Sequence, residues 1–145
     1  MLHIESKAME EMLKDAERTF PDECCGFLFG SEEGDRRIIN TITVVDNSKE
    51  GDKRRRFEIS PTDYLKAESF AEENGLSLLG VYHSHPNSPA IPSELDRVSA
   101  QPYFSYIIIS VFDGLYSHAR SWQLNDQYQF EEEKIKNQSF ITQIN

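Results

Sequence analysis

Two histidines and an aspartate stand at a spacing that suits a metal ion. His83 and His85 lie two residues apart at the end of an apolar run, and Asp96 follows a segment that contains three prolines. Because alternate residues of an extended strand point to the same side, both imidazoles can face one ion. Two histidines and one carboxylate leave tetrahedral zinc with an open position for water or substrate. The spacing therefore predicts a hydrolytic zinc site.

Prolines are expected to restrict the backbone of the segment between the histidines and the aspartate. Pro86 favours extended geometry at His85, and the later prolines reduce the entropy that is lost when a site is assembled. Ser93 and Asp96 also fit the S-x-x-D pattern that begins many helices, so helix capping alone could explain these two residues. The capping and metal-binding interpretations are compatible with each other.

The same residues resemble the JAMM (MPN-plus) motif H-x-H-x7-S-x2-D, in which His83, His85, Ser93 and Asp96 occupy the fixed positions. Glu23, followed by a strand of the G-x-L/F-x-G type, resembles the upstream glutamate element of that family. The resemblance implies that the two histidines and the aspartate hold Zn²⁺. It also implies that Glu23 is the general base and that Ser93 helps to hold the oxyanion.

The resemblance extends to residue 133 or so and implies a cytidine-deaminase-like JAMM/MPN architecture. We expect a metallopeptidase domain at residues 1–134 and a C-terminal tail at 135–145. Similar short bacterial members trim ubiquitin-like sulfur-carrier proteins to expose a Gly-Gly tail, which implies such a carrier as substrate and partner. The alternatives are a non-catalytic MPN-type binding or scaffold module and a zinc hydrolase of a small-molecule amide.

The apolar pattern predicts the elements that must position these residues. Helices are expected at residues 5–20, 61–74 and 93–100, and strands at 24–29, 37–45, 76–85, 106–112 and 115–124. The order favours a single domain of the mixed α+β (α/β) class, with a mixed central sheet flanked by helices. The last residues, 131–145, have weak periodicity, and we expect them to fray.

Charge and hydropathy exclude several classes of partner. Acidic residues outnumber basic ones by 25 to 15, and the resulting formal charge of −10 disfavours nucleic acid. The chain has no apolar stretch long enough to span a membrane and no signal-peptide pattern at its start, so we expect no membrane partner and a cytoplasmic location. Nothing in the sequence specifies an oligomeric state.

The remaining reactive side chains are expected outside the site. Cys24 and Cys25 are adjacent, which is unsuitable for a mutual disulfide, and we interpret both as buried small apolar residues. His3 and His118 have no partner at a ligand spacing. The basic run at residues 53–56 is either a solvated loop or a patch that steers an acidic carrier protein.

Overall fold

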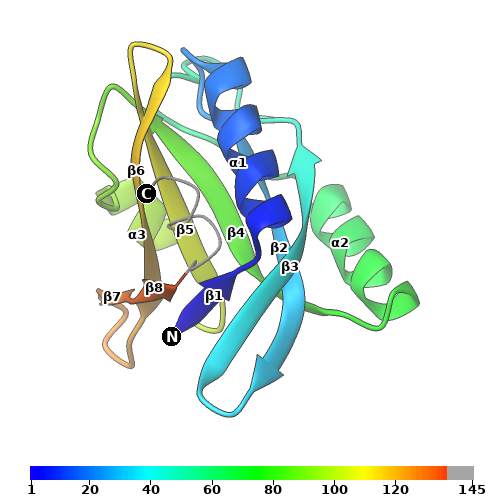
Figure 1. Cartoon of the computed structure of the whole chain (residues 1–145). Helices are drawn as coiled ribbons and strands as arrows, with labels where there is room; N and C mark the ends of the chain where they lie inside the picture. Colours follow the sequence, from blue (N-terminus) through cyan, green and yellow to red (C-terminus); the bar gives the residue numbers. More distant parts are fainter. Residues whose placement is uncertain (137–145) are drawn as a thin grey trace.

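An eight-stranded mixed sheet forms the centre of the protein (Figure 1). The computed structural model describes residues 1–136, and its strands lie in the order β7-β6-β5-β4-β2-β3-β1-β8. The strands are β1 (Leu2–Ile4), β2 (Cys25–Glu33), β3 (Arg36–Val45), β4 (Ser77–Pro86), β5 (Ser105–Phe112), β6 (Leu115–Leu124), β7 (Phe130–Glu133) and β8 (Ile135–Lys136). The helices are α1 (Ser6–Thr19), α2 (Pro61–Glu73) and α3 (Glu94–Ser99). The predicted mixed α+β class is confirmed.

Both expected hairpins are present. β2 and β3 pair antiparallel, and so do β5 and β6. Asp113 and Gly114, at the predicted turn of the second hairpin, have φ values of 52° and 83°. Two successive positive φ values match the twist of a tight hairpin, which explains the Asp-Gly pair in the sequence. β4 joins the two hairpins, because it pairs antiparallel with β2 and parallel with β5.

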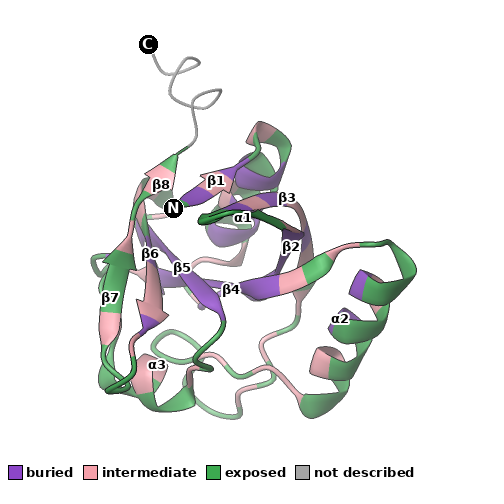
Figure 2. Ribbon diagram, turned by 90° about the horizontal axis from the view of Figure 1, so that it is seen from below, coloured by how far each residue is buried: buried purple, intermediate pink, exposed green. Residues whose placement is uncertain are grey.

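Helices cover the sheet on both faces, so the central strands are buried on both sides (Figure 2). Leu28 and Tyr82 pack in the core under α1, together with apolar residues of that helix such as Met12. The neighbouring residues Phe27 and Val81 face the other way, into the core under α2. This alternation is why β2 and β4 are apolar almost continuously. The end of β4, which carries His83 and His85, therefore continues directly from the packed centre of the sheet.

The boundaries of α2 follow the sequence signals closely. The Ser60 hydroxyl accepts a hydrogen bond from the Asp63 amide at 3.1 Å, and Pro61 occupies the first turn. Gly75 follows the helix with a φ of 64°, which glycine adopts at little cost.

Three short strands were not predicted. β1 pairs parallel with both β3 and β8, and its Leu2 and Ile4 are fully buried. β7, which pairs with β6, carries three glutamates in four residues and has little apolar signal. Strands this short show too few alternations to be recognised, and their positions depend on partners distant in sequence. The expected fraying is therefore wrong for residues 131–133.

The expected domain boundary at residue 134 is close to the end of the described chain. Ile135 and Lys136, assigned to the tail, form β8. The rest of the tail, residues 137–145, lies outside the described residues, and the boundary stays a prediction. Within residues 1–136, no helix has the length and apolar character needed to cross a membrane.

Candidate metal centre

His83 and His85 project from the last part of β4 and are almost fully buried, with 1% and 8% exposure. Their rings lie on the same side of the strand with centroids 5.2 Å apart, as alternation along a strand requires. The intervening Ser84 faces the other way, and its hydroxyl accepts a hydrogen bond from the Cys24 amide at 2.8 Å. That bond ties the end of β4 to the segment that carries Glu23.

Asp96 reaches the histidines from the first turn of α3. Its two carboxylate oxygens lie 3.8 Å from His83 Nε2 and 3.1 Å from His85 Nε2. Ser93 and Asp96 form a reciprocal capping box: the Ser93 amide donates to Asp96 Oδ2 at 2.9 Å, and the Asp96 amide donates to Ser93 Oγ at 3.1 Å. The capping interpretation is confirmed, and it holds the Asp96 side chain in the orientation that meets both imidazoles.

Glu23 approaches His83 from the opposite edge of the imidazole ring. Its Oε1 lies 3.4 Å from His83 Nδ1, and the residue is only 3% exposed. The backbone around it is fixed, because its amide donates to the Lys53 carbonyl at 2.7 Å and Asn47 Nδ2 donates to its own carbonyl at 3.2 Å. The loop after β3 therefore positions a carboxylate that lies two residues before β2.

Phe57 forms a wall of the site that sequence reasoning did not assign. Its ring stacks on that of His83 with centroids 4.4 Å apart and planes inclined by 24°. This contact restricts rotation of the imidazole and keeps water from one of its faces. The sequence shows Phe57 only as an apolar residue before a helix cap, which by itself gives no sign of this stacking.

The proline loop, residues 87–92, fixes the tautomer of His85. The Pro89 carbonyl lies 2.9 Å from His85 Nδ1 and can only accept, so Nδ1 carries the proton and Nε2 is left to bind a metal. Two side chains of β6 hold the next residue of the loop. The Ala90 amide donates to His118 Nε2 at 3.0 Å, and Trp122 Nε1 donates to the Ala90 carbonyl at 3.1 Å.

His118 therefore does not lie among the predicted ligands, in agreement with the sequence, but it supports the loop that orients one of them. No signal within the sequence links His118 or Trp122 to the proline loop. His3 lies in β1, away from these groups, while Cys24 and Cys25 are buried as expected.

The charges around the site keep Asp96 in the form that binds a metal, and they favour a proton on His85 that a bound metal would replace. Burial tends to raise the pKa of Asp96, but His83, the hydrogen bond to His85 and the Ser93 amide together hold that pKa well below its ordinary value. Asp96 is therefore ionised at neutral pH, as a metal ligand must be. Burial lowers the pKa of His85, yet hydrogen bonds to Asp96 and the Pro89 carbonyl outweigh burial and raise it overall.

Unsatisfied polar atoms lie where His83 faces Glu23. Glu23 Oε1 and His83 Nδ1 are buried without a hydrogen-bond partner among the described residues, since their mutual contact is too poorly aligned to make one. An unsatisfied buried group costs roughly 1–3 kcal/mol. Glu23, His83 and His85 also offer ligand atoms that all lie within 4.8 Å of one another. Nitrogen and carboxylate donors at such distances fit zinc. This group contains Glu23 and does not contain the predicted ligand Asp96, which lies beside the Nε2 atoms of both histidines.

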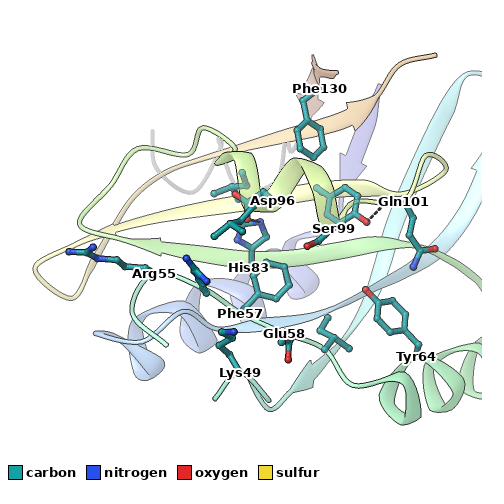
Figure 3. A pocket seen from close by; sticks show the side chains of 15 residues that line it. Lys49, Arg55, Phe57, Glu58, Tyr64, His83, Asp96, Ser99, Gln101 and Phe130 are labelled. Carbon is teal, nitrogen blue, oxygen red and sulfur yellow. Dashed lines mark hydrogen bonds and ion pairs between the residues drawn. The ribbon is translucent and has the colours of Figure 1, made fainter. Parts of the chain in front are cut away.

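Cavities open on two sides of these residues. The α2–α3 cavity, of about 320 Å³, includes His83, Asp96 and Phe57 and is lined by several aromatic side chains (Figure 3). The proline-loop cavity, of about 580 Å³, includes Glu23, His85 and Ser93. The candidate site residues are thus divided between two cavities, which share Arg55 in their linings.

Comparisons with known proteins place the chain in a family. Residues 5–125 match the family described as prokaryotic homologs of the JAB domain. A desampylase of Pyrococcus furiosus is 32% identical over 113 residues, which cover 78% of this chain and 74% of the relative. A probable TtuB-protein conjugate cleaving protease of Thermus thermophilus is 31% identical, with coverage of 79% and 73%. A CysO-cysteine peptidase of Mycobacterium tuberculosis is 29% identical, with coverage of 87% and 84%.

Solved structures agree with this assignment. The solution structure of a Desulfitobacterium hafniense protein is 33% identical, has a TM-score of 0.83 and covers 94% of this chain and 92% of its own. A JAB1/MPN domain protein of Archaeoglobus fulgidus, at 18% identity and a TM-score of 0.60, shares the fold over 93% of this chain and 97% of its own. The predicted JAMM/MPN fold and JAMM-type hydrolase are confirmed. The protein belongs to the family of prokaryotic homologs of the JAB domain.

Proposed function

We propose that this chain is a zinc-dependent peptidase that hydrolyses the amide bond after the glycine tail of a small ubiquitin-like sulfur-carrier protein. The observation that carries the proposal is that β4, α3 and the segment before β2 bring four largely buried side chains together. Asp96 faces Nε2 of both His83 and His85, and Glu23 faces Nδ1 of His83.

In this proposal His83, His85 and Asp96 hold the zinc ion. When bound, zinc supplies Lewis acidity, which lowers the pKa of water and polarises a carbonyl group. The protein prepares the ligands in advance. The Pro89 carbonyl orients His85, the Ser93 amide orients Asp96, and Phe57 packs on His83. This preparation reduces the entropy lost when the ion binds.

Glu23 is the group that moves the proton. Its buried carboxylate accepts a proton from the attacking water and passes it to the nitrogen of the leaving amine. A base of this kind has to be held within reach of both atoms. The hydrogen bonds from the Glu23 amide to Lys53 and from Asn47 to the Glu23 carbonyl support that role, because they fix the backbone on both sides of the carboxylate.

Ser93 is suited to stabilise the carbonyl oxygen as it gains negative charge. The Ser93 Oγ accepts the Asp96 amide, which leaves its own O–H free to donate. A fixed donor aimed at a developing oxyanion typically contributes a factor of about 10²–10³ in kcat.

The shape of the α2–α3 cavity supports an extended, narrow tail. Phe57, Tyr64, Tyr106 and Phe130 contribute to its lining, and Phe57 stacks on His83, so a tail that reaches His83 has to lie against aromatic rings. Glycine has no side chain, so its backbone can approach such rings most closely. The relatives named for TtuB-protein conjugates and for CysO-cysteine support a carrier-protein substrate.

Cleavage of a defined conjugate tests the proposal. A ubiquitin-like carrier ending in Gly-Gly, joined through its terminal carbonyl to an added residue, is incubated with the wild type, and the product mass is measured. We expect hydrolysis after the last glycine and at least about tenfold slower hydrolysis when that glycine is replaced by valine.

The other outcomes identify the rival functions. Stable binding of the carrier without cleavage would favour a scaffold module. Rapid hydrolysis of small acyl amides, with the carrier conjugate left intact, would favour a small-molecule hydrolase.

A further inference from the structure

We propose that the basic loop, residues 49–56, is a docking surface for the folded body of the carrier, and that the carrier meets this loop with an acidic face. The inference rests on the proposed function and goes beyond the tail, because it specifies the chemistry of the carrier surface around the tail. It arises from the cationic side chains that border both cavities.

The basic loop borders the candidate site on both sides. Lys49 and Arg56 line the α2–α3 cavity. Arg54 lines the proline-loop cavity, and Arg55 lines both. In Figure 3, the Arg55 side chain extends away from His83. A protein whose tail reaches the candidate site therefore meets the basic loop, whichever cavity the tail enters.

The cations of the loop are available to a partner. Residues 53–56 are one lysine and three arginines in succession, and all four are exposed. Within residues 1–136 their side chains make one ion pair, between Arg55 and Asp52, which are 3.8 Å apart and both more than half exposed. A pair of this kind contributes little free energy, so a carboxylate of the partner displaces solvent and not a strong internal contact.

Asn47 fixes the backbone that carries these side chains. Its Oδ1 accepts hydrogen bonds from the Lys49 amide at 3.0 Å and from the Glu58 amide at 3.1 Å. Its Nδ2 donates to the Arg56 carbonyl at 3.0 Å and to the Glu23 carbonyl at 3.2 Å. An unconstrained run of charges loses entropy when it binds, whereas this loop is shaped in advance and is tied to the segment of the candidate base.

Acidic residues in and beside the loop favour a protein partner over a nucleic acid. Glu50 and Asp52 lie among the cations, and Glu58 follows them in the lining of the α2–α3 cavity. A continuous phosphate backbone would approach these carboxylates as well as the cations, on a chain with a formal charge of −10. Single carboxylates of a folded protein can be placed opposite single arginines, whose planar fork of donors matches them.

The charge of the rest of the chain gives the docking its direction. The formal charge is −10 even though residues 53–56 are all cationic. An acidic carrier is therefore repelled over most of the surface and attracted beside the candidate site. Such an arrangement raises the rate of productive encounters and disfavours the wrong orientations.

Binding of the cleaved carrier tests the inference without any need for catalysis. The probe is an acidic ubiquitin-like carrier that ends in a free Gly-Gly tail and carries a fluorescent label, and its Kd for the wild type is measured by anisotropy. We expect the Kd to rise about tenfold between about 0.02 M and 0.3 M salt, because salt screens the attraction between exposed charges.

Charge reversal assigns the docking to the loop. The loop variant, Lys53→Glu with Arg54→Glu, should bind the carrier about tenfold more weakly at low salt, since two attractions become repulsions. The matched control is Lys7→Glu with Lys14→Glu, which makes the same change in net charge at two exposed residues of α1. This helix covers the opposite face of the sheet from α2, so the control should bind nearly as tightly as the wild type.

A charge swap on the carrier identifies the face that docks. The swapped carrier has lysines in place of the carboxylates beside its tail. Compared with the unmodified carrier, it should bind the wild type more weakly and the loop variant more tightly, because opposite charges then face each other again.

Three results would overturn the docking surface. They are equal weakening in the loop variant and the control, a carrier affinity that responds neither to salt nor to the charge swap, and tighter binding of a single-stranded oligonucleotide than of the carrier. The expected binding together with an uncleaved conjugate, on zinc-loaded wild type, would support the docking surface and contradict the proposed peptidase.

Discussion

Trp122 donates a hydrogen bond from Nε1 to the Ala90 carbonyl at 3.1 Å, and this bond connects a strand of the sheet to the loop that orients a candidate metal ligand. Ala90 is fully buried, and its amide is held by His118 at the same time. The preceding carbonyl, that of Pro89, accepts from His85. The orientation of His85 thus depends on residues of β6 that never approach the candidate metal position themselves.

Trp122→Phe should weaken metal binding. The variant keeps an aromatic ring and removes only the donor to Ala90, so the proline loop loses one of the bonds that fix the Pro89 carbonyl. Loss of a direct hydrogen-bond partner of a ligand typically costs about 10–100-fold in metal affinity. Trp122 acts through the next residue of the loop, so we expect the lower end of that range. Competition with a chelator measures the change. Arg120→Gln on the same strand is the control, and an affinity unchanged in Trp122→Phe would show that the loop holds its shape without this bond.

Ser93→Ala should affect stability and turnover separately. Loss of a helix cap costs about 1 kcal/mol, so the metal-free variant should unfold at a lower urea concentration. In addition, kcat should fall by about 10²–10³, because the oxyanion loses a donor. Ser60→Ala removes the corresponding cap of α2, at a residue that lines neither cavity, and should show only the change in stability. Equal kcat values for the two variants would remove Ser93 from the mechanism.

The protein should lose stability in alkaline solution. Burial raises the pKa of the Cys25 thiol from 9.0 to about 12, and the nearby Asp15 and Glu23 act in the same direction. Above about pH 9 the unfolded chain loses this proton while the folded protein keeps it. The free energy of unfolding should therefore fall with rising pH, by up to about 1.4 kcal/mol per pH unit for each such group.

Urea unfolding of the metal-free protein between about pH 7 and 11 measures this effect. Cys24 contributes in the same sense, because burial also raises its pKa. Cys25→Ala should show a shallower decrease above pH 9, since one of the ionising groups is gone. A free energy of unfolding that is constant or increases over this range would contradict the buried, neutral state of the thiols.

Local patterns in the sequence were enough to predict most of the fold and to select His83, His85 and Asp96 as candidate ligands. The roles of Glu23 and Ser93 came from the family resemblance. The alternation that places His83 and His85 on one side, and the capping box that fixes Asp96, both act over a few residues and are visible in the chain. The Asp113 and Gly114 turn is local in the same way.

Features that depend on distant contacts were not predictable in this way. The pairing of β1 with β8 joins the two ends of the described chain. Phe57 meets His83 across the fold, and the bonds from His118 and Trp122 to Ala90 join residues about thirty positions apart. No periodicity or short motif encodes such contacts, because they arise only when the sheet has assembled.

The most direct test of the central claim is the zinc content per chain, measured by elemental analysis on the wild type, on His85→Ala and on Glu23→Gln, together with cleavage of the Gly-Gly carrier conjugate. We predict about one zinc and full activity for the wild type, and loss of both in His85→Ala. We predict that Glu23→Gln keeps its zinc while its kcat falls by about 10²–10⁴, as expected for a proton carrier. A wild type that cleaves the conjugate without any bound metal, or a Glu23→Gln variant that cleaves it at the wild-type rate, would contradict this mechanism.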